Sequence, residues 1–175
     1  MTRRSLGNII TLCFFVFIAT TLTGCGTGST AVIKPVSDLK NNSRSVSVNE
    51  VSSKVAVPEK ALEQIRRVLI NRLKNNRAVD VVTDGDGAVI LDVEVIRFET
   101  GDQLARWVSG GGGEMGKGEI ILETTYIDSR SRQEIGKIKT HGDILAGFFG
   151  GSMDTAYSNS IQEIVEYTAE KFGDR

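Results

Sequence analysis

The single imidazole of this 175-residue chain, His141, is the side chain best suited to acid–base chemistry. A histidine base also needs a nucleophile and a third group that orients the ring, and the fold must bring them together. Nothing near His141 in the sequence supplies either group. We therefore expect a surface or loop histidine and predict neither catalytic residues nor enzyme activity. A pocket that gathered His141 with carboxylates would revive an enzyme acting on cell-wall or lipid material.

Three carboxylates, Asp92, Glu94 and Glu123, occur in segments with strand-like patterns. On one polar sheet face they could hold a hard cation such as Ca²⁺, but a solvated face explains them more simply. The two cysteines, Cys13 and Cys25, both lie near the N-terminus, so no cysteine-ligated metal site or disulfide framework is expected beyond it. We predict no metal and no cofactor.

Two glycine-rich segments invite a comparison with phosphate-binding loops. Gly111, Gly116 and Lys117 have P-loop spacing, but Gly118 stands where a Mg²⁺-binding Ser or Thr belongs, and a strand-like segment follows instead of a helix. The run from 150 to 152 precedes a predicted helix and could present N–H groups to an anion, although Asp154 favours simple capping. We predict no nucleotide.

A basic cluster lies towards the end of the first predicted helix; it comprises Arg66, Arg67, Arg72, Lys74 and Arg77. These cations could meet lipid headgroups or a polyanion, but cations are also favoured at the negative end of a helix dipole. The net charge of −1 gives no sign of a nucleic-acid partner.

The N-terminal region has the pattern of an export signal. Arg3 and Arg4 precede an apolar run over residues 9–22, which is shorter than the ~20 residues of a membrane-spanning helix. It ends in Leu22, Thr23, Gly24 and Cys25, a sequence that resembles the bacterial lipobox. Small residues there give a peptidase access to the backbone, and the Cys25 thiol would take the diacylglycerol.

Lipidation at Cys25 would make the membrane itself a binding partner of the protein. Several acyl chains hold a lipoprotein almost irreversibly, at ~0.8 kcal/mol per buried CH₂. Gly26, in place of an aspartate, resembles the signal for the outer membrane, with the protein facing the periplasm; the inner membrane is the alternative. An ordinary signal peptide with an incidental Cys25 is the competing interpretation.

The domain organisation follows from this signal. We predict a lipoprotein signal peptide over 1–24, a lipidated cysteine and flexible tether over 25–43, and a single periplasmic domain over 44–175. A short apolar patch at residues 31–33 could instead form an extra edge strand.

Hydrophobic periodicity predicts the elements of the domain. Strands are expected over 44–51, 78–82, 88–98, 119–127 and 133–140, the last two as a hairpin with a polar turn at 128–132. A helix opens at Pro58 with an apolar stripe of Leu62, Ile65, Leu69 and Leu73. A final helix begins near Ser152 or Asp154, and its inner face carries Tyr157, Ile161, Ile164, Val165, Thr168 and Phe172. This β-α-β-β-β-β-α order predicts an α+β two-layer sandwich with a mostly antiparallel sheet and both helices on one face.

The hairpin places the two glycine-rich loops, 99–116 and 142–151, at the same end of the sheet, opposite the 128–132 turn. Their aromatic, basic and glycine residues could form a partner-docking rim, or the aromatics could fold back onto the core. The rim would contain Arg106, Trp107, Gly110, Gly111, Gly112, Gly113, Phe148 and Phe149.

The Arg106-Trp107-x-x-Gly-Gly run, together with the segment from Gly116 to Ile120 and the glycines before the last helix, resembles an uncharacterised family of proteobacterial lipoproteins. Its label is domain of unknown function. The element order is also similar to the N-terminal domain of the Tol translocation protein, the curli-secretion lipoprotein and lipoproteins that activate peptidoglycan synthases. This resemblance implies an envelope accessory role and carries over no catalytic residue.

The resulting expectation is a non-catalytic binding module, anchored in the membrane, that docks on an envelope protein. The alternative is a structural subunit that assembles with its own copies into an envelope or secretion complex.

Overall fold

The centre of the fold is an antiparallel meander of three long strands, β5 (Val89–Glu99), β6 (Gly118–Asp128) and β7 (Glu134–Ile144). The computed structural model describes residues 28–37, 44–83, 88–99, 118–144 and 153–173. In β5, Val89, Leu91, Val93 and Val95 are buried on one face, because side chains alternate along a strand. The predicted strands over 88–98, 119–127 and 133–140 are confirmed, with β7 four residues longer at its end.

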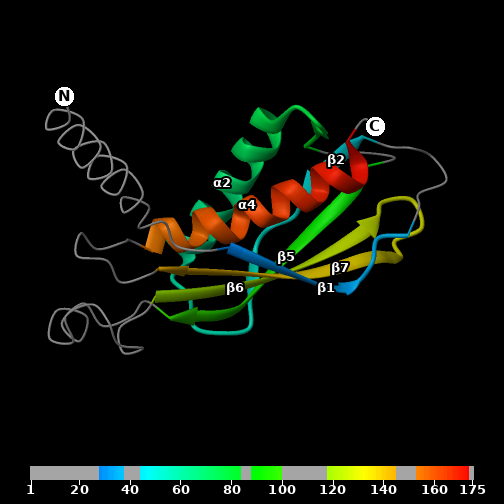
Figure 1. The fold of residues 1–175 in the computed structure, drawn as a ribbon. Helices are drawn as coiled ribbons and strands as arrows, with labels where there is room; N and C mark the ends of the chain where they lie inside the picture. Colours follow the sequence, from blue (N-terminus) through cyan, green and yellow to red (C-terminus); the bar gives the residue numbers. More distant parts are fainter. Residues whose placement is uncertain (1–27, 38–43, 84–87, 100–117, 145–152, 174–175) are drawn as a thin grey trace, which may run out of the picture.

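Shorter strands extend the meander on both sides (Figure 1). The seven-stranded sheet has the order β1-β7-β6-β5-β2-β4, with β3 paired to β5. Strands β2 (Ser45–Val48), β3 (Ser52–Ser53) and β4 (Asp80–Val81) run parallel to their neighbours, whereas the other pairs are antiparallel. Within the predicted strand over 44–51 only residues 45–48 form a strand, β2, and β3 begins just beyond it at residue 52; the strand predicted over 78–82 is only two residues long.

The first strand corrects the predicted tether. Residues 28–34 form β1 (Gly28–Lys34), which pairs antiparallel with β7, so the alternative of an extra edge strand is the one that the structure adopts. A sheet supplies hydrogen bonds for the backbone of this segment, whose first six residues are uncharged and partly β-branched, whereas a tether would leave that backbone to water.

Helix α2 (Glu59–Asn76) begins after Pro58, which occupies the N-cap position, and ends at Arg77, whose φ of 60° is left-handed. Ile65, Leu69 and Leu73 from the predicted stripe are fully buried, and Leu62 is partly buried. The predicted helix is confirmed, with Pro58 one position earlier than expected.

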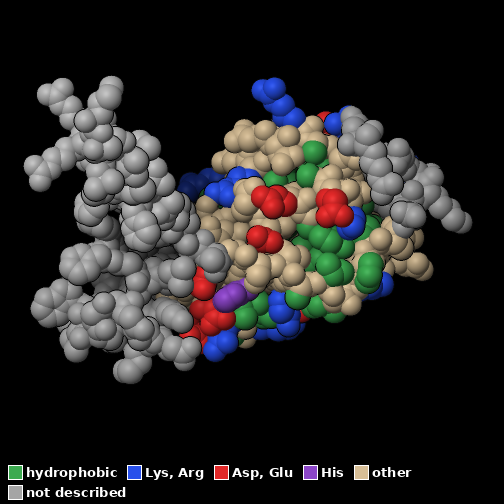
Figure 2. All heavy atoms as spheres, viewed as in Figure 1, with side chains coloured by type: hydrophobic (Ala, Val, Ile, Leu, Met, Phe, Trp, Pro, Cys, Tyr) green, Lys and Arg blue, Asp and Glu red, His purple; other side chains and the backbone are tan. Residues whose placement is uncertain are grey.

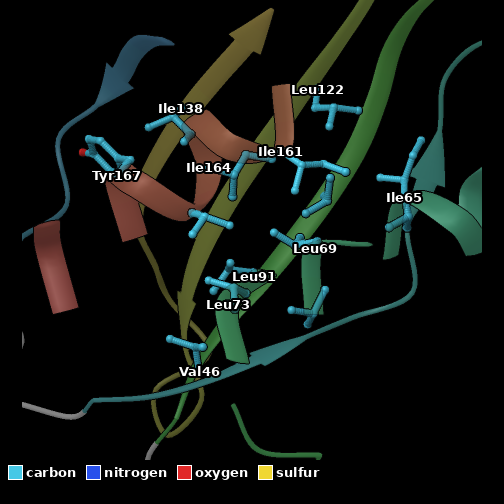
Figure 3. Packing of buried hydrophobic residues seen from close by; sticks show 14 of the residues in the cluster. Val46, Ile65, Leu69, Leu73, Leu91, Leu122, Ile138, Ile161, Ile164 and Tyr167 are labelled. Atoms are coloured by element: carbon cyan, nitrogen blue, oxygen red, sulfur yellow. The ribbon is translucent and has the colours of Figure 1, made fainter. Parts of the chain in front are cut away.

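Helix α4 (Met153–Phe172) lies beside α2 on the same face of the sheet (Figure 1). Every residue predicted for its inner side that the structure describes is buried: Tyr157, Ile161, Ile164, Val165, Thr168 and Phe172. Figure 3 shows side chains of both helices pointing towards those of the strands. The fold is thus the predicted α+β two-layer sandwich. No helix in the described part of the chain combines the length and apolarity needed to cross a bilayer.

The turn between β6 and β7 is held by Asp128. Its carboxylate accepts hydrogen bonds from the backbone N–H groups of Arg130 at 2.8 Å and Ser131 at 3.4 Å. The first of these bonds is the main reason that the pKa of Asp128 lies below its ordinary value. This polar turn confirms the hairpin and fixes its closed end opposite the C-terminal ends of β5 and β7.

Candidate functional site

The strand β1 forms one edge of the described sheet and is seven residues long. Its inner side pairs with β7, from Gly28 opposite Gly142 to Lys34 opposite Lys137, and no described strand covers its outer side. Val32 and Ile33 are 48% and 51% exposed, and two such apolar residues next to a free strand edge favour pairing with another strand. At the opposite edge, β4 is only two residues long.

The C-terminal end of β1, called its far end from here on, is bonded to the rest of the fold. The register shifts between Val32 and Lys34, and the Lys34 Nζ lies 3.4 Å from a carboxylate oxygen of Glu134 and donates to its carbonyl at 2.8 Å. Further along, the Ser37 N–H donates to the Ile135 carbonyl at 2.9 Å. The bulge, the lysine and Pro35 are features that limit pairing at this end of the strand.

The N-terminal end of β1, called its near end from here on, contacts α4. The Thr30 hydroxyl donates to the Glu163 carboxylate at 2.6 Å. A Cβ on Gly28 would lie 3.0 Å from the Asn159 carbonyl oxygen, and one on its partner Gly142 would lie 2.2 Å from the Ala156 carbonyl oxygen. At Gly142 only glycine allows α4 to approach this closely. Gly142, expected at the start of a loop, is therefore a packing residue within β7.

The ends of the two glycine-rich loops lie at the near end of β1. Glu99 pairs with Glu119, and Gly118 pairs with Ile144, while Gly28 lies beside Gly142 two residues away. The described residues that flank 100–117 and 145–152 thus occupy one end of the sheet, as predicted. The rim residues themselves lie outside the described residues: Arg106, Trp107, Gly110, Gly111, Gly112, Gly113, Phe148 and Phe149. The same holds for Leu22, Thr23, Gly24 and Cys25.

His141 belongs to a row of charged side chains on the sheet face that the helices leave open. Its Nε2 lies 3.0 Å from one carboxylate oxygen of Glu119, and the other oxygen lies 3.3 Å from Nε of Arg97. Arg97 also donates to Glu99 at 2.8 Å. This hydrogen bond, helped by the charge of Glu119, raises the pKa of Arg97. Figure 2 shows acidic side chains gathered beside the histidine.

This row can hold charge but is poorly arranged to activate a nucleophile. Ser29 is the residue opposite His141 on β1, and the Nε2 atom of the ring lies 3.0 Å from Glu119, which Arg97 also contacts, without the geometry of a hydrogen bond. A triad needs a hydrogen bond between the histidine and a hydroxyl nucleophile, and Nε2 of His141 makes none in the described part of the chain. The group therefore has the character of an ion-pair row across β5, β6 and β7.

The three carboxylates considered for a cation do share the open face, since Glu94 and Glu123 pair directly and Asp92 lies two residues before Glu94. Lysines contact two of them: Lys54 lies 2.6 Å from Glu94, and Lys137 lies 3.2 Å from Glu123. The hydrogen bond to Glu94 raises the pKa of Lys54. Among the described residues no cluster of three potential metal ligands occurs.

Two members of the basic cluster connect elements of the fold. Arg66 donates to the carbonyls of Asn49 at 3.1 Å and Val48 at 3.2 Å, which ties α2 to the end of β2. Arg72 donates to the Ser158 carbonyl at 3.0 Å and to the Gln162 side chain at 2.8 Å, which ties α2 to α4. Their hydrogen bonds indicate a structural role that neither sequence interpretation, dipole or polyanion, had considered.

The edge strand β1 is the candidate binding feature that the sequence analysis gave only as an alternative to a flexible tether. Its signal was a run of six uncharged residues, 28–33, that ends in two β-branched side chains before Lys34 and Pro35. The surrounding Gly, Ser and Thr content favoured a tether, because those residues are common in linkers. The pairing partner lies about a hundred residues away in β7, so no local pattern could identify it.

Comparison with known proteins is consistent with this fold. The dodecameric PelC from Paraburkholderia phytofirmans superposes with a TM-score of 0.59 at 12% identity over 86% of this chain and 99% of PelC. A protein of the DUF330 family from Xanthomonas campestris gives a TM-score of 0.50 at 11% identity, over 81% of this chain and 90% of its own. These likenesses concern the fold alone. No curated protein matched the chain.

A family model described as "Domain of unknown function (DUF4410)" matches residues 31–147, well over half of the chain. The match begins within β1 and continues beyond the end of β7. It agrees with the expectation of an uncharacterised family, whereas the lipoprotein status and the Arg106-Trp107 motif are still predictions. The chain belongs to the DUF4410 family.

Proposed function

We propose that this protein is a lipid-anchored accessory module of the bacterial envelope that acts through protein contacts rather than catalysis. Cys25 would hold it in the outer membrane facing the periplasm, with the inner membrane as the alternative. The observation that carries the proposal is the position of β1: a free strand edge begins at Gly28, three residues after the predicted lipidation site.

This spacing replaces the long tether with a short one. Three residues span at most about 10 Å when fully extended, at ~3.3–3.6 Å per residue. The near end of the sheet, where the flanks of both glycine-rich loops lie, would therefore be held close to the bilayer.

The first candidate partner is a foreign envelope protein. Under this proposal it meets the near end of the sheet, with Trp107 and the glycine run as its predicted anchor. The charged row of Arg97, Glu119 and His141 lies at the same end and supplies polar contacts around such an interface.

The second candidate is assembly with copies of the same chain. The observation that favours it is the printed description of PelC, a structural neighbour, as a dodecamer. The free edge of β1 supports the same candidate, because sheet edges are common sites of self-association.

In-cell crosslinking of the full-length protein, followed by mass spectrometry, tests both candidates. One dominant foreign protein, lost in a Cys25→Ser variant and in a folded Trp107→Ala variant, would support the docking module. Adducts of the chain with itself alone would favour assembly. If neither product forms while the protein is abundant and folded, the proposal of a contact-based function fails.

A further inference from the structure

We propose that β1 is a self-pairing site: the free edge of β1 joins the same edge of a second copy, antiparallel, and the two sheets become continuous across a two-fold axis. This inference rests on the proposed lipid anchor and deepens the second candidate function by naming its contact. The juxtaposition that carries it is an uncharged, exposed strand edge next to the anchoring residue.

The charge pattern of β1 fits its own copy. In a two-fold contact each residue meets residues of the same strand, so a charge near the axis would lie close to the same charge of the second copy. Residues 28–33 carry no charge, and the only charge of β1, Lys34, is already close to Glu134 at 3.4 Å. Pairing with a strand of a different protein would not require residues 28–33 to be uncharged.

The exposed apolar residues lie where this pairing would cover them. Val32 and Ile33 are two of the three large hydrophobic side chains that are well exposed among the described residues; the third, Val55, lies outside β1. Pairing would continue until the bulge between Val32 and Lys34, and Pro35 ends it because proline has no N–H to donate. The contact is therefore about five residues long.

So short a contact needs help from the membrane. A strand pair of this length buries less area than the ~1,200 Å² of a stable protein interface, so free copies would associate weakly. Two copies anchored in one bilayer have a raised effective concentration and a common orientation. Antiparallel pairing of residues 28–32 separates the two Gly28 residues by about 14 Å along the strands, which is four steps of ~3.4 Å, so β1 must run along the membrane surface for both anchors to reach the bilayer.

Cysteine scanning in intact membranes tests the pairing. Single substitutions Ser29→Cys, Thr30→Cys and Ala31→Cys are introduced into the full-length chain and oxidised, with Val55→Cys as the matched exposed control. Directly opposed residues of antiparallel strands have Cα atoms 4.5–5.5 Å apart, within the 4.4–6.8 Å range of disulfides, so dimer yield should peak at one β1 position and decline on either side.

The unsubstituted protein is the control for the anchor. Cleavage before Cys25 removes Cys13, and lipidation consumes the Cys25 thiol, so the mature lipoprotein has no free thiol and should give no disulfide dimer. If the unsubstituted chain itself forms a dimer through Cys25, the lipid anchor is wrong, and this failure is distinguishable from a failure of β1 pairing. The result for the unsubstituted chain therefore decides whether the lipid anchor is correct before the cysteine scan of β1 is interpreted.

A charge variant supplies the second test. Ala31→Lys combined with Thr30→Cys would place like charges next to the axis of the paired strands, and we expect loss of the dimer; Ala31→Thr with the same cysteine should retain it, because a neutral β-branched residue suits a strand. Equal yields at β1 positions and Val55 would overturn the proposal, as would no dimer in folded, membrane-bound protein. Disulfide adducts with a different protein would replace the second copy with a foreign partner.

Discussion

Replacing Gly142 by alanine should push α4 away from the sheet. The added Cβ would lie 2.2 Å from the Ala156 carbonyl oxygen and 2.9 Å from the Ser160 nitrogen. The first contact falls 1.2 Å short of an ordinary 3.4 Å approach, and both neighbours are backbone atoms of a helix that cannot rotate aside. Overpacking of this kind costs about 1–3 kcal/mol, and the rigid neighbours place Gly142→Ala at the upper end of that range.

Its register partner provides the matched control. A Cβ on Gly28 would lie 3.0 Å from the Asn159 carbonyl oxygen and from atoms of the Glu163 side chain. That shortfall of 0.4 Å is small, and the Glu163 side chain can move. Because alanine also stiffens the unfolded chain, which stabilises the fold by about 0.4–1 kcal/mol, Gly28→Ala should be nearly neutral.

Urea unfolding of the purified variants, followed by circular dichroism, measures both effects. We expect Gly142→Ala to lower the free energy of unfolding by about 2–3 kcal/mol, which lowers the midpoint by roughly 1–3 M urea at m-values of about 1–3 kcal/mol/M. The midpoint for Gly28→Ala should stay near that of the parent. Equal effects of the two variants, in either direction, would refute the argument that α4 is positioned by the glycine of β7.

Three further predictions concern buried hydrogen bonds, pH and helix termination. Thr168 donates to the Ile164 carbonyl at 2.6 Å, so Tyr126 must be the donor in its 3.0 Å bond to Thr168. In urea unfolding Tyr126→Phe should therefore cost about 1 kcal/mol, and Thr168→Val more, because it leaves a buried hydroxyl unpaired. Burial raises the pKa of Tyr126, so the unfolded state ionises first, near pH 10, and stability should fall by about 1.4 kcal/mol per pH unit above it; Tyr126→Phe should flatten this decline in pH-dependent melting. Arg77→Gly should raise the urea midpoint by relieving a φ of 60°, with a net gain of about 0.5–1 kcal/mol after the added chain entropy.

The helices were predictable because their burial repeats locally. Leu62, Ile65, Leu69 and Leu73 recur every three or four residues, and such a stripe specifies one buried face without reference to the rest of the chain. The alternation in β5 worked for the same reason, since Val89, Leu91, Val93 and Val95 have the period of a strand.

The predictions that failed concern residues whose role depends on contacts distant in the sequence. β1 looks like a linker until β7 is placed beside it, and Gly142 looks like a loop residue until α4 approaches its Cα. Arg66 and Arg72 looked like a surface cluster because sequence spacing does not reveal which carbonyl each guanidinium will reach. Spacing did place the flanks of both glycine-rich loops together, because a hairpin must return its chain to the end where it began.

The distribution of protective features along β1 connects the fold to the proposed function. An uncovered strand edge is an aggregation hazard, and proteins usually limit it with bulges, lysines and prolines. All three lie at the far end of β1 or just after it, at residues 33–35, whereas residues 28–32 have none. A lipid anchor at Cys25 would limit what those unprotected residues can meet, because only molecules at the same membrane surface would reach them. The asymmetry is thus what we expect of an edge that is kept open for one kind of contact, beside the bilayer, and closed to others.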